Sequence, residues 1–457
     1  MARDGLGGRL GRGARLARTG ARGALGLAGA NVRRMTGDET AQDIAHEELA
    51  LRLAEVLGEM KGAAMKVGQL LSFVDLDLPD EVRSVYHEAL SGLRDQAPPM
   101  DPEKIERVIA EDFGEPATRV FAEWHREPLA AASIGQVHEA RLHDGRRVAV
   151  KVQYPGVADA VRADLRNAET FAPIARLVAP NQEIGPVLDE VRDRVEDELD
   201  YRREAQYQGA FASRYAGHPF IVVPGVVSEL CRDRVLVSDL VEGRRFDDVV
   251  RDGDEELHQR VGEIIFRYAF GSIGRFRLFN GDPHPGNYLI LDDGRVAFLD
   301  YGSVKMFTVE RHQQLRAIDD AIIQDDRGAF LRLMRDLRFV PPGVDVDEDM
   351  LYDWFQSYSR PTAAEQPFTF TPQYAAEVLG TVTDPRSPQA NMLRRLNLPA
   401  DFVLLNRIQW GLNSILGQLR ASNDWRGIRN EYVADGPPAT PLGEQDQAWF
   451  AQRTAAS

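Results

Sequence analysis

Cysteine is almost absent from this chain of 457 residues, in which Cys231 is the single example. One thiol excludes an internal disulfide framework and any zinc or iron–sulfur site that needs several cysteines. No run reaches about 18 consecutive apolar residues, so the sequence predicts no transmembrane helix. The N-terminus also lacks the apolar run of about 7–15 residues that marks a secretory signal. These absences favour a cytoplasmic protein.

The charge is unevenly distributed along the chain, which carries a formal net charge of −16 at pH 7. Residues 1–36 contain eight arginines and one acidic residue, so this segment carries +7 and the remainder −23. An acidic body repels nucleic acid, so no DNA or RNA partner is expected. The basic segment, residues 1–38, is interpreted as a flexible tail. Peripheral contact of this segment with an anionic membrane surface is the alternative.

Hydrophobic periodicity divides the rest of the chain into helical and β-rich parts. From about Thr40 apolar residues recur every three or four positions, which predicts an amphipathic helix. Asp144-Gly145 and Asp293-Gly294 each lie between two β-rich runs, which predicts hairpins over 130–153 and 288–299. The predicted units are a tail at 1–38, a helical extension at 39–127, a β-rich lobe at 128–243, a mainly helical lobe at 244–430 and a poorly ordered tail at 431–457.

Two polar loops flank the second predicted hairpin and carry the strongest chemical signal. They read Asp282-Pro283-His284-Pro285-Gly286-Asn287 and Asp300-Tyr301-Gly302, the spacing of a kinase catalytic loop and metal loop. Asn287 and Asp300 offer the hard oxygen ligands that Mg²⁺ prefers. Asp282 is placed to orient a hydroxyl or water and to accept its proton. His284, between two prolines, is interpreted as structural.

Lys151 ends the run Val148-Ala149-Val150-Lys151, which fits the strand that carries the phosphate-binding lysine of kinases. The loop before this lysine contains Ala130-Ala131-Ala132-Ser133 instead of G-x-G-x-x-G. Alanine tolerates a positive φ poorly, so the loop is expected to hold phosphates differently from a glycine-rich one. The sequence predicts Mg-ATP chemistry with Lys151 and Asp282 as catalytic residues.

The segment after Gly302 is unusually short for a protein kinase. Only residues 303–307 separate it from the next predicted helix, and no A-P-E element follows. A protein substrate would have no platform on which to bind. The triplet before the catalytic loop reads Asn280-Gly281-Asp282 and lacks the arginine that clamps a phosphorylated activation loop. Phosphoryl chemistry on something other than ordinary proteins is therefore expected.

These motifs together resemble the UbiB/AarF-type atypical kinase-like family, which includes proteins that support coenzyme Q biosynthesis. Lys66-Val67-Gly68-Gln69 is similar to the family's K-x-G-Q signature, and Ala130–Val137 to its alanine-rich loop. Glu198-Leu199-Asp200 followed by Glu204-Ala205 is similar to its E-x-D element. The Asp282–Asn287 loop completes the resemblance, which covers about residues 40–420.

The resemblance implies an α+β, two-lobed protein-kinase-like fold with an N-terminal helical extension. It implies that the K-x-G-Q helix covers the nucleotide site and blocks protein substrates. Glu204 would pair with Lys151. The remaining implied ATP-site residues are Lys66, Gln69, Ala131, Ala132, Ser133, Glu198 and Asp200, the last two contacting the K-x-G-Q helix. Without the resemblance, Lys66 is an ordinary polar residue of an amphipathic helix, and Glu198 and Glu204 belong to an exposed charged run.

Such proteins bind ATP with weak ATPase activity and are linked to isoprenoid-quinone metabolism and membranes. This chain departs from the family pattern at Asn280, where histidine is common, and at Ser238, where a bulkier side chain is common. Two alternatives stay open. One is a small-molecule kinase acting on an isoprenoid, sugar or antibiotic hydroxyl, and the other is a nucleotide-gated lipid-binding module.

Overall fold

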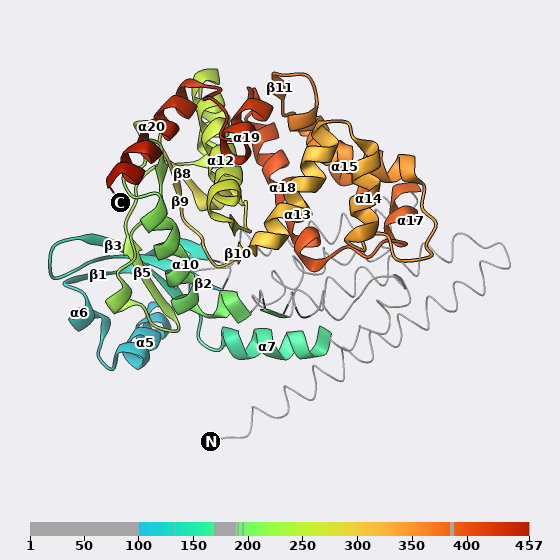
Figure 1. The fold of residues 1–457 in the computed structure, drawn as a ribbon. Helices are drawn as coiled ribbons and strands as arrows, with labels where there is room; N and C mark the ends of the chain where they lie inside the picture. Colours follow the sequence, from blue (N-terminus) through green and yellow to red (C-terminus); the bar gives the residue numbers. More distant parts are fainter. Residues whose placement is uncertain are drawn as a thin grey trace.

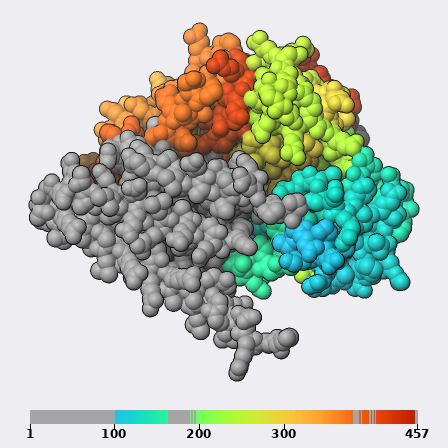
Figure 2. All heavy atoms as spheres, turned by 180° about the vertical axis from the view of Figure 1, so that it is seen from behind, coloured from blue at the N-terminus to red at the C-terminus, as the bar shows by residue number. Residues whose placement is uncertain are grey.

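The computed structural model describes residues 100–132, 134–168, 189, 192–193, 196–383 and 388–456. The predicted tail at 1–38 and most of the predicted helical extension, with Lys66 and Gln69, lie outside the described residues, as does Ser133. Figure 1 shows a β-rich lobe at the lower left and a larger helical lobe above it and to the right. In Figure 2, seen from behind, the blue and cyan β-rich lobe lies beneath and beside the helical lobe. The predicted two-lobed fold is confirmed for the described part of the chain.

The first lobe is built on a four-stranded antiparallel sheet with the order β1-β2-β3-β5. Its strands are β1 Glu123–Ala132, β2 Gly135–Arg141, β3 Arg147–Gln153 and β5 Val235–Asp239. The predicted Asp144-Gly145 hairpin is confirmed as β2–β3, and Gly145 takes a φ of +90°. The strands begin at Glu123, earlier than the predicted boundary at 128, because β1 extends the sheet beyond that hairpin.

Besides the sheet, this lobe contains the helices α5 Pro102–Phe113, α6 Ala117–Val120 and α10 Tyr201–Arg214. A fourth, α7 Val157–Ala168, follows β3. Alternation along β3 sends Val148, Val150 and Val152 into one apolar core with α5. The alternate residues of β3, among them Lys151, point to the opposite face of the sheet, where α10 lies.

The helical lobe is organised around the long helix α12, Glu255–Phe276, which buries residues along most of its length. The predicted second hairpin is confirmed as β8 Tyr288–Ile290 and β9 Val296–Phe298 in a sheet ordered β4-β9-β8-β6. The short strands are β4 Ile221–Val222, β6 Arg244–Arg245, β7 Leu278–Asn280, β10 Val304–Met306, β11 Phe368–Thr369 and β12 Ser422–Asn423. The other helices are α11 Phe246–Asp252, α13 Val309–Ile323, α14 Arg327–Asp336, α15 Glu348–Ala363, α16 Pro372–Thr383, α17 Pro388–Leu393, α18 Ala400–Gln418, α19 Trp425–Val433 and α20 Pro441–Ala456.

The single helix expected over 308–335 is two helices, α13 and α14. Asp325 has a φ of +55°, a left-handed conformation that ends α13. The next residue, Asp326, caps α14 by accepting a hydrogen bond from the backbone N–H of Ala329 at 2.8 Å.

The expectation of a poorly ordered tail at 431–457 was wrong, because α19 continues to Val433 and α20 covers Pro441–Ala456. Between these two helices residues 434–440 form neither helix nor strand. Polar contacts fix α20: Asp446 accepts from His218 at 2.9 Å and from Arg275 at 2.8 Å. Arg453 donates to backbone carbonyls at the end of α10 and just beyond it. A helix anchored by charged groups gives little apolar periodicity for sequence reasoning to detect.

His218 is held as a neutral imidazole by this arrangement. Its Nδ1 atom accepts the backbone N–H of Ile221 at 3.1 Å, so its hydrogen lies on Nε2 and is donated to Asp446. Burial lowers the pKa of His218, and the hydrogen bond to Asp446 opposes this only in part. A protonated His218 would lose the Nδ1 acceptor position.

Acidification from about pH 7.5 to about 5.5 should therefore lower the free energy of unfolding. Below about pH 6.5 the unfolded chain takes up a proton that folded His218 refuses, which costs at most about 1.4 kcal/mol per pH unit. Urea unfolding at several pH values measures this slope. His218→Gln keeps a donor to Asp446 without titrating and should flatten it, whereas His143→Gln in an exposed turn should not. Equal slopes in all three proteins would contradict the assignment.

Candidate active site

Lys151 of β3 lies at the centre of a buried charge cluster between the lobes. Its Nζ donates to Glu204 Oε1 at 2.7 Å and Oε2 at 2.9 Å, and to Asp300 Oδ2 at 3.3 Å. The Lys151 side chain is 14% exposed and that of Glu204 only 2%. Burial alone would lower the pKa of Lys151, but the charges of Asp300 and Glu204 outweigh it and hold the pKa well above its ordinary value. The ammonium therefore stays charged.

Helix α10 positions Glu204 against this lysine. Asp200 caps the helix by accepting backbone N–H groups of Arg202 and Arg203 at 3.0 and 3.2 Å. One turn later Glu204 faces the sheet, and the ring of Tyr201 lies beneath the Lys151 ammonium, 5.0 Å from its centroid. The predicted Lys151–Glu204 contact is thus present.

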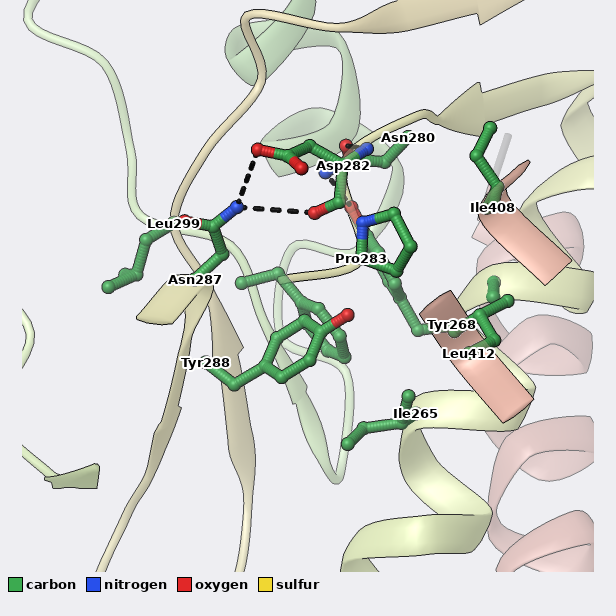
Figure 3. A pocket seen from close by; sticks show the side chains of 12 residues that line it. Ile265, Tyr268, Asn280, Asp282, Pro283, Asn287, Tyr288, Leu299, Ile408 and Leu412 are labelled. Atoms are coloured by element: carbon green, nitrogen blue, oxygen red, sulfur yellow. Dashed lines mark hydrogen bonds between the residues drawn. The ribbon is translucent and has the colours of Figure 1, made fainter. Parts of the chain in front are cut away.

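The loop after β7 brings Asp282 and Asn287 together, as Figure 3 shows. Asn287 Nδ2 donates to both the carbonyl oxygen and Oδ2 of Asp282, each at 3.2 Å. His284 Nδ1 accepts the backbone N–H of Gly286 at 3.0 Å, a hydrogen bond within the loop, and its structural role stays a prediction. The backbone of Asn287 also accepts from Leu299 at 3.0 Å, which sets this loop beside the residue that precedes Asp300.

Asn280 ties the two polar loops to each other. Its Nδ2 donates to the carbonyl oxygen of Asp300 at 2.7 Å, and its Oδ1 accepts from the backbone N–H of Asp282 at 3.3 Å. Tyr301 is fully buried, and its hydroxyl donates to the carbonyl oxygen of Phe298 at 3.2 Å. Asn280 therefore connects both loops through hydrogen bonds to their backbones.

The alanines of the alanine-rich segment belong to β1, whose register with β2 shifts between Pro128 and Ala130. Ala130, Ala131 and Ala132 pair with residues of β2, and none of them has a positive φ. Their Cβ atoms therefore cause no backbone strain. Gly135 is the position where a Cβ cannot fit, because it would collide with the carbonyl oxygen of Val152 and lie 3.0 Å from the hydroxyl oxygen of Tyr201.

The donor set fits a magnesium–nucleotide complex. Asn287 uses its Nδ2 for Asp282, which leaves Oδ1 as a possible cation ligand, and Asp300 supplies a carboxylate that is 27% exposed. Among the described residues no group of three His, Cys, Asp or Glu could hold a metal alone. Mg²⁺ usually binds through one or two protein ligands together with substrate phosphates and water, so two ligands are sufficient.

The structure brings together Lys151, Glu204 and Asp300 in one cluster and Asp282 with Asn287 in the neighbouring loop. Glu198 lies beside the second loop, since a Cβ at Gly302 would come within 3.6 Å of its Cγ. Asp200 is exposed and caps α10, one turn before Glu204. Ala131 is exposed on β1, and Ala132 ends that strand.

Sequence reasoning missed Tyr201 and the connecting role of Asn280. Tyr201 lies three residues before Glu204, so the helical spacing alone places both on one face of α10. The Asn280 contacts join residues 20 positions apart, and no local pattern signals them.

Comparison with known proteins agrees with this geometry. The family model described as the ABC1 atypical kinase-like domain matches residues 92–334. The chain is 33% identical over 305 residues to an uncharacterized Synechocystis protein, sll0005, covering 65% of this chain and 44% of that protein. It is 31% identical over 284 residues to the mitochondrial atypical kinase COQ8 of Saccharomyces cerevisiae, covering 61% and 55%. The chain spans about half the length of the curated relatives it matches.

A solved structure is also similar. The complex of Rv3197 with erythromycin from Mycobacterium tuberculosis aligns with a TM-score of 0.61 and 32% identity, covering 86% of this chain and 97% of that one. The family model covers more than half of this chain, including the Lys151, Glu204 and Asp282–Asp300 elements. The resemblance inferred from the motifs is confirmed: the chain belongs to the ABC1 atypical kinase-like family.

Proposed function

We propose that this protein is a Mg-ATP-binding atypical kinase or ATPase that supports isoprenoid-quinone or related lipid metabolism, and not an ordinary protein kinase. The observation that carries the proposal is the intact cluster of Lys151, Glu204 and Asp300 beside the Asp282–Asn287 loop. A chain that had lost nucleotide chemistry would be under no constraint to keep both the Lys151–Glu204–Asp300 contacts and the Asp282–Asn287 contact.

Each residue has a role in this proposal. Lys151, oriented by Glu204, contributes the positive charge that binds the ATP phosphates. Asn287 and Asp300 would hold Mg²⁺, which neutralises charge on the phosphates. Asp282, kept in place by Asn287, orients the attacking hydroxyl or water and accepts its proton.

The segment after Gly302 argues against a protein substrate. Its residues form β10, which pairs back onto β7 in the register Val304–Asn280, and α13 begins at Val309. No length is left for a peptide-binding platform.

The lipid part of the proposal rests on relatives such as the mitochondrial atypical kinases COQ8 and COQ8B. Within the described residues no helix has the length and apolar composition needed to cross a bilayer. The basic segment at 1–38 is the candidate for contact with an anionic membrane surface.

A second candidate is a kinase for a small molecule with a hydroxyl group, such as an isoprenoid alcohol, a sugar or an antibiotic. The erythromycin complex of the similar solved structure supports it, because erythromycin is a hydroxyl-bearing antibiotic. Incubation with Mg-ATP and each compound, followed by mass analysis of the product, distinguishes this candidate. A nucleotide-gated lipid-binding module is the third, and there Asp282→Asn should leave cellular function unchanged.

Asp300→Asn should reduce Mg-ATP hydrolysis at least about a hundredfold, because the amide keeps the hydrogen bond from Gly302 but loses the charge that binds the cation. Hydrolysis is measured with and without anionic liposomes, and lipid should raise the wild-type rate. Asp293→Asn is the matched control, since Asp293 lies in the β8–β9 turn with Arg295. Equal rates in wild type and Asp300→Asn would refute the proposed site.

Ser238 should let the nucleotide site accept bulky adenine analogues. It pairs with Ala149 across β3 and β5, and Lys151 is two residues further along β3, so all three lie on one face of the sheet. Ser238→Met should weaken binding of N6-benzyl-ATP about tenfold or more while leaving ATP binding nearly unchanged. Competition binding measures both. Equal weakening of the two nucleotides would contradict this placement of Ser238.

A further inference from the structure

A large cavity lies inside the helical lobe, separate from the Lys151 cluster. Its empty volume is about 1330 Å³, including space open to solvent, and its walls come from α12, α13, α15, α18 and α19. Much of the lining is aromatic: Phe266, Phe270, Phe279, Phe355, Phe370 and Phe402. Ligand-binding pockets in proteins typically combine such apolar walls with a few polar groups.

A buried amide on the cavity wall has incomplete hydrogen bonding. Asn413 of α18 is only 3% exposed, and its Nδ2 atom makes no hydrogen bond of normal geometry in the described part of the chain. The amide lies near the Tyr374 hydroxyl, which donates to the carbonyl oxygen of Ser357 at 3.0 Å and whose oxygen has room to accept one of the two Nδ2 hydrogens. The second Nδ2 hydrogen is then still without an acceptor among the described residues. A buried donor without a proper acceptor is costly, and a ligand oxygen would satisfy it.

The charged groups of the cavity already satisfy one another. Arg429 donates to Asp319 and to the neighbouring Asp320. Arg316 forms an ion pair with Asp320 at 3.6 Å. His312 is not a strong cation, because burial, Arg316 and Arg277 lower its pKa. Two arginines thus face two carboxylates, so the cavity offers no net charge to attract an ion.

The cavity also shares its walls with the catalytic loop. Phe279 of β7 lines it and directly precedes Asn280. On α18, Leu412 lines both this cavity and the small one beside Asp282 and Asn287, where Figure 3 labels it. Gly411 is so close to Pro283 that a Cβ there would lie 2.6 Å from the proline Cγ. Because of this close contact, a displacement of α18 also shifts the loop that contains Pro283 and Asp282.

We propose that the helical-lobe cavity is a second binding site, for an uncharged, mainly apolar molecule whose carbonyl, hydroxyl or ether oxygen accepts the Asn413 amide hydrogen. The bound molecule fills the space between α12, α13 and α18 and thereby restrains the loop that carries Asp282. This site goes beyond the proposed nucleotide function and does not depend on it, because no side chain of the Lys151 cluster lines the cavity.

Nile red, an uncharged dye with a ring carbonyl, is a suitable probe, and its fluorescence titration needs no nucleotide. The full chain should bind it, Leu405→Trp should weaken binding at least about tenfold by filling the cavity, and Asn413→Leu about fivefold to tenfold by removing the donor. Leu379→Trp on the exposed surface of α16 is the matched control and should bind as the wild type does. The melting temperature of Asn413→Leu is measured beside that of the wild type, so that binding is compared between folded proteins.

Hydrogen–deuterium exchange tests the link to the catalytic loop. The dye should slow exchange in peptides from α18 and from residues 278–291 of the wild type, but not of Leu405→Trp. Dye binding that is unchanged in Asn413→Leu and in Leu405→Trp would overturn the site. Slower exchange in α18 without any change at 278–291 would overturn the restraint on the loop. A failure of ATP hydrolysis affects neither result, so the two proposals can fail separately.

Discussion

The buried ion pair between Lys151 and Glu204 is the constraint on which the arrangement of the two lobes depends. Neither charge is stable alone at 14% and 2% exposure, and removing one partner from such a pair costs about 3–5 kcal/mol. The pair therefore requires α10 to pack on the face of β3 opposite the valine core. Asp300 adds a second carboxylate to the same ammonium, which links the sheet of the first lobe to the loop of the second.

Aromatic contacts connect the Lys151–Glu204 pair to the helical lobe. The Tyr301 ring lies 5.1 Å from Phe211 of α10, and its hydroxyl is 3.2 Å from that of Tyr268 on α12. The residue after Asp300 therefore contacts both the helix that holds Glu204 and the central helix of the other lobe. Asn280 completes the connection by joining the Asp300 backbone to that of Asp282. The five polar residues thus form one mechanically connected unit.

Sequence reasoning predicted the parts of this unit that local signals encode. The Asp-Gly turns predicted both hairpins, and the alternating valines predicted the strand that carries Lys151. The spacing of the polar loops pointed to Asp282 and Asn287. Asp200 caps α10, and its expected contact with the K-x-G-Q helix stays a prediction because that helix lies outside the described residues. The expectations for Lys66, Gln69 and Ser133 stay predictions for the same reason. The error at α20 has a physical reason: its anchors pair with residues more than 170 positions away, which no periodicity reveals.

Helix α20 restricts the movement of α10, the helix that carries Glu204. Glu204 lies near the start of α10, whereas Arg453 of α20 donates to the carbonyl oxygens of Ser213 and Ala216 at its other end. Asp446 on the same α20 bonds to Arg275 of α12. The helix carrying the glutamate is therefore held at both ends, and the short β10 segment leaves no loop to push it aside. Control by swinging this helix would have to break a buried ionic network. A ligand cavity behind the catalytic loop would modulate the site through Asp282 instead, without disturbing the Lys151–Glu204 pair.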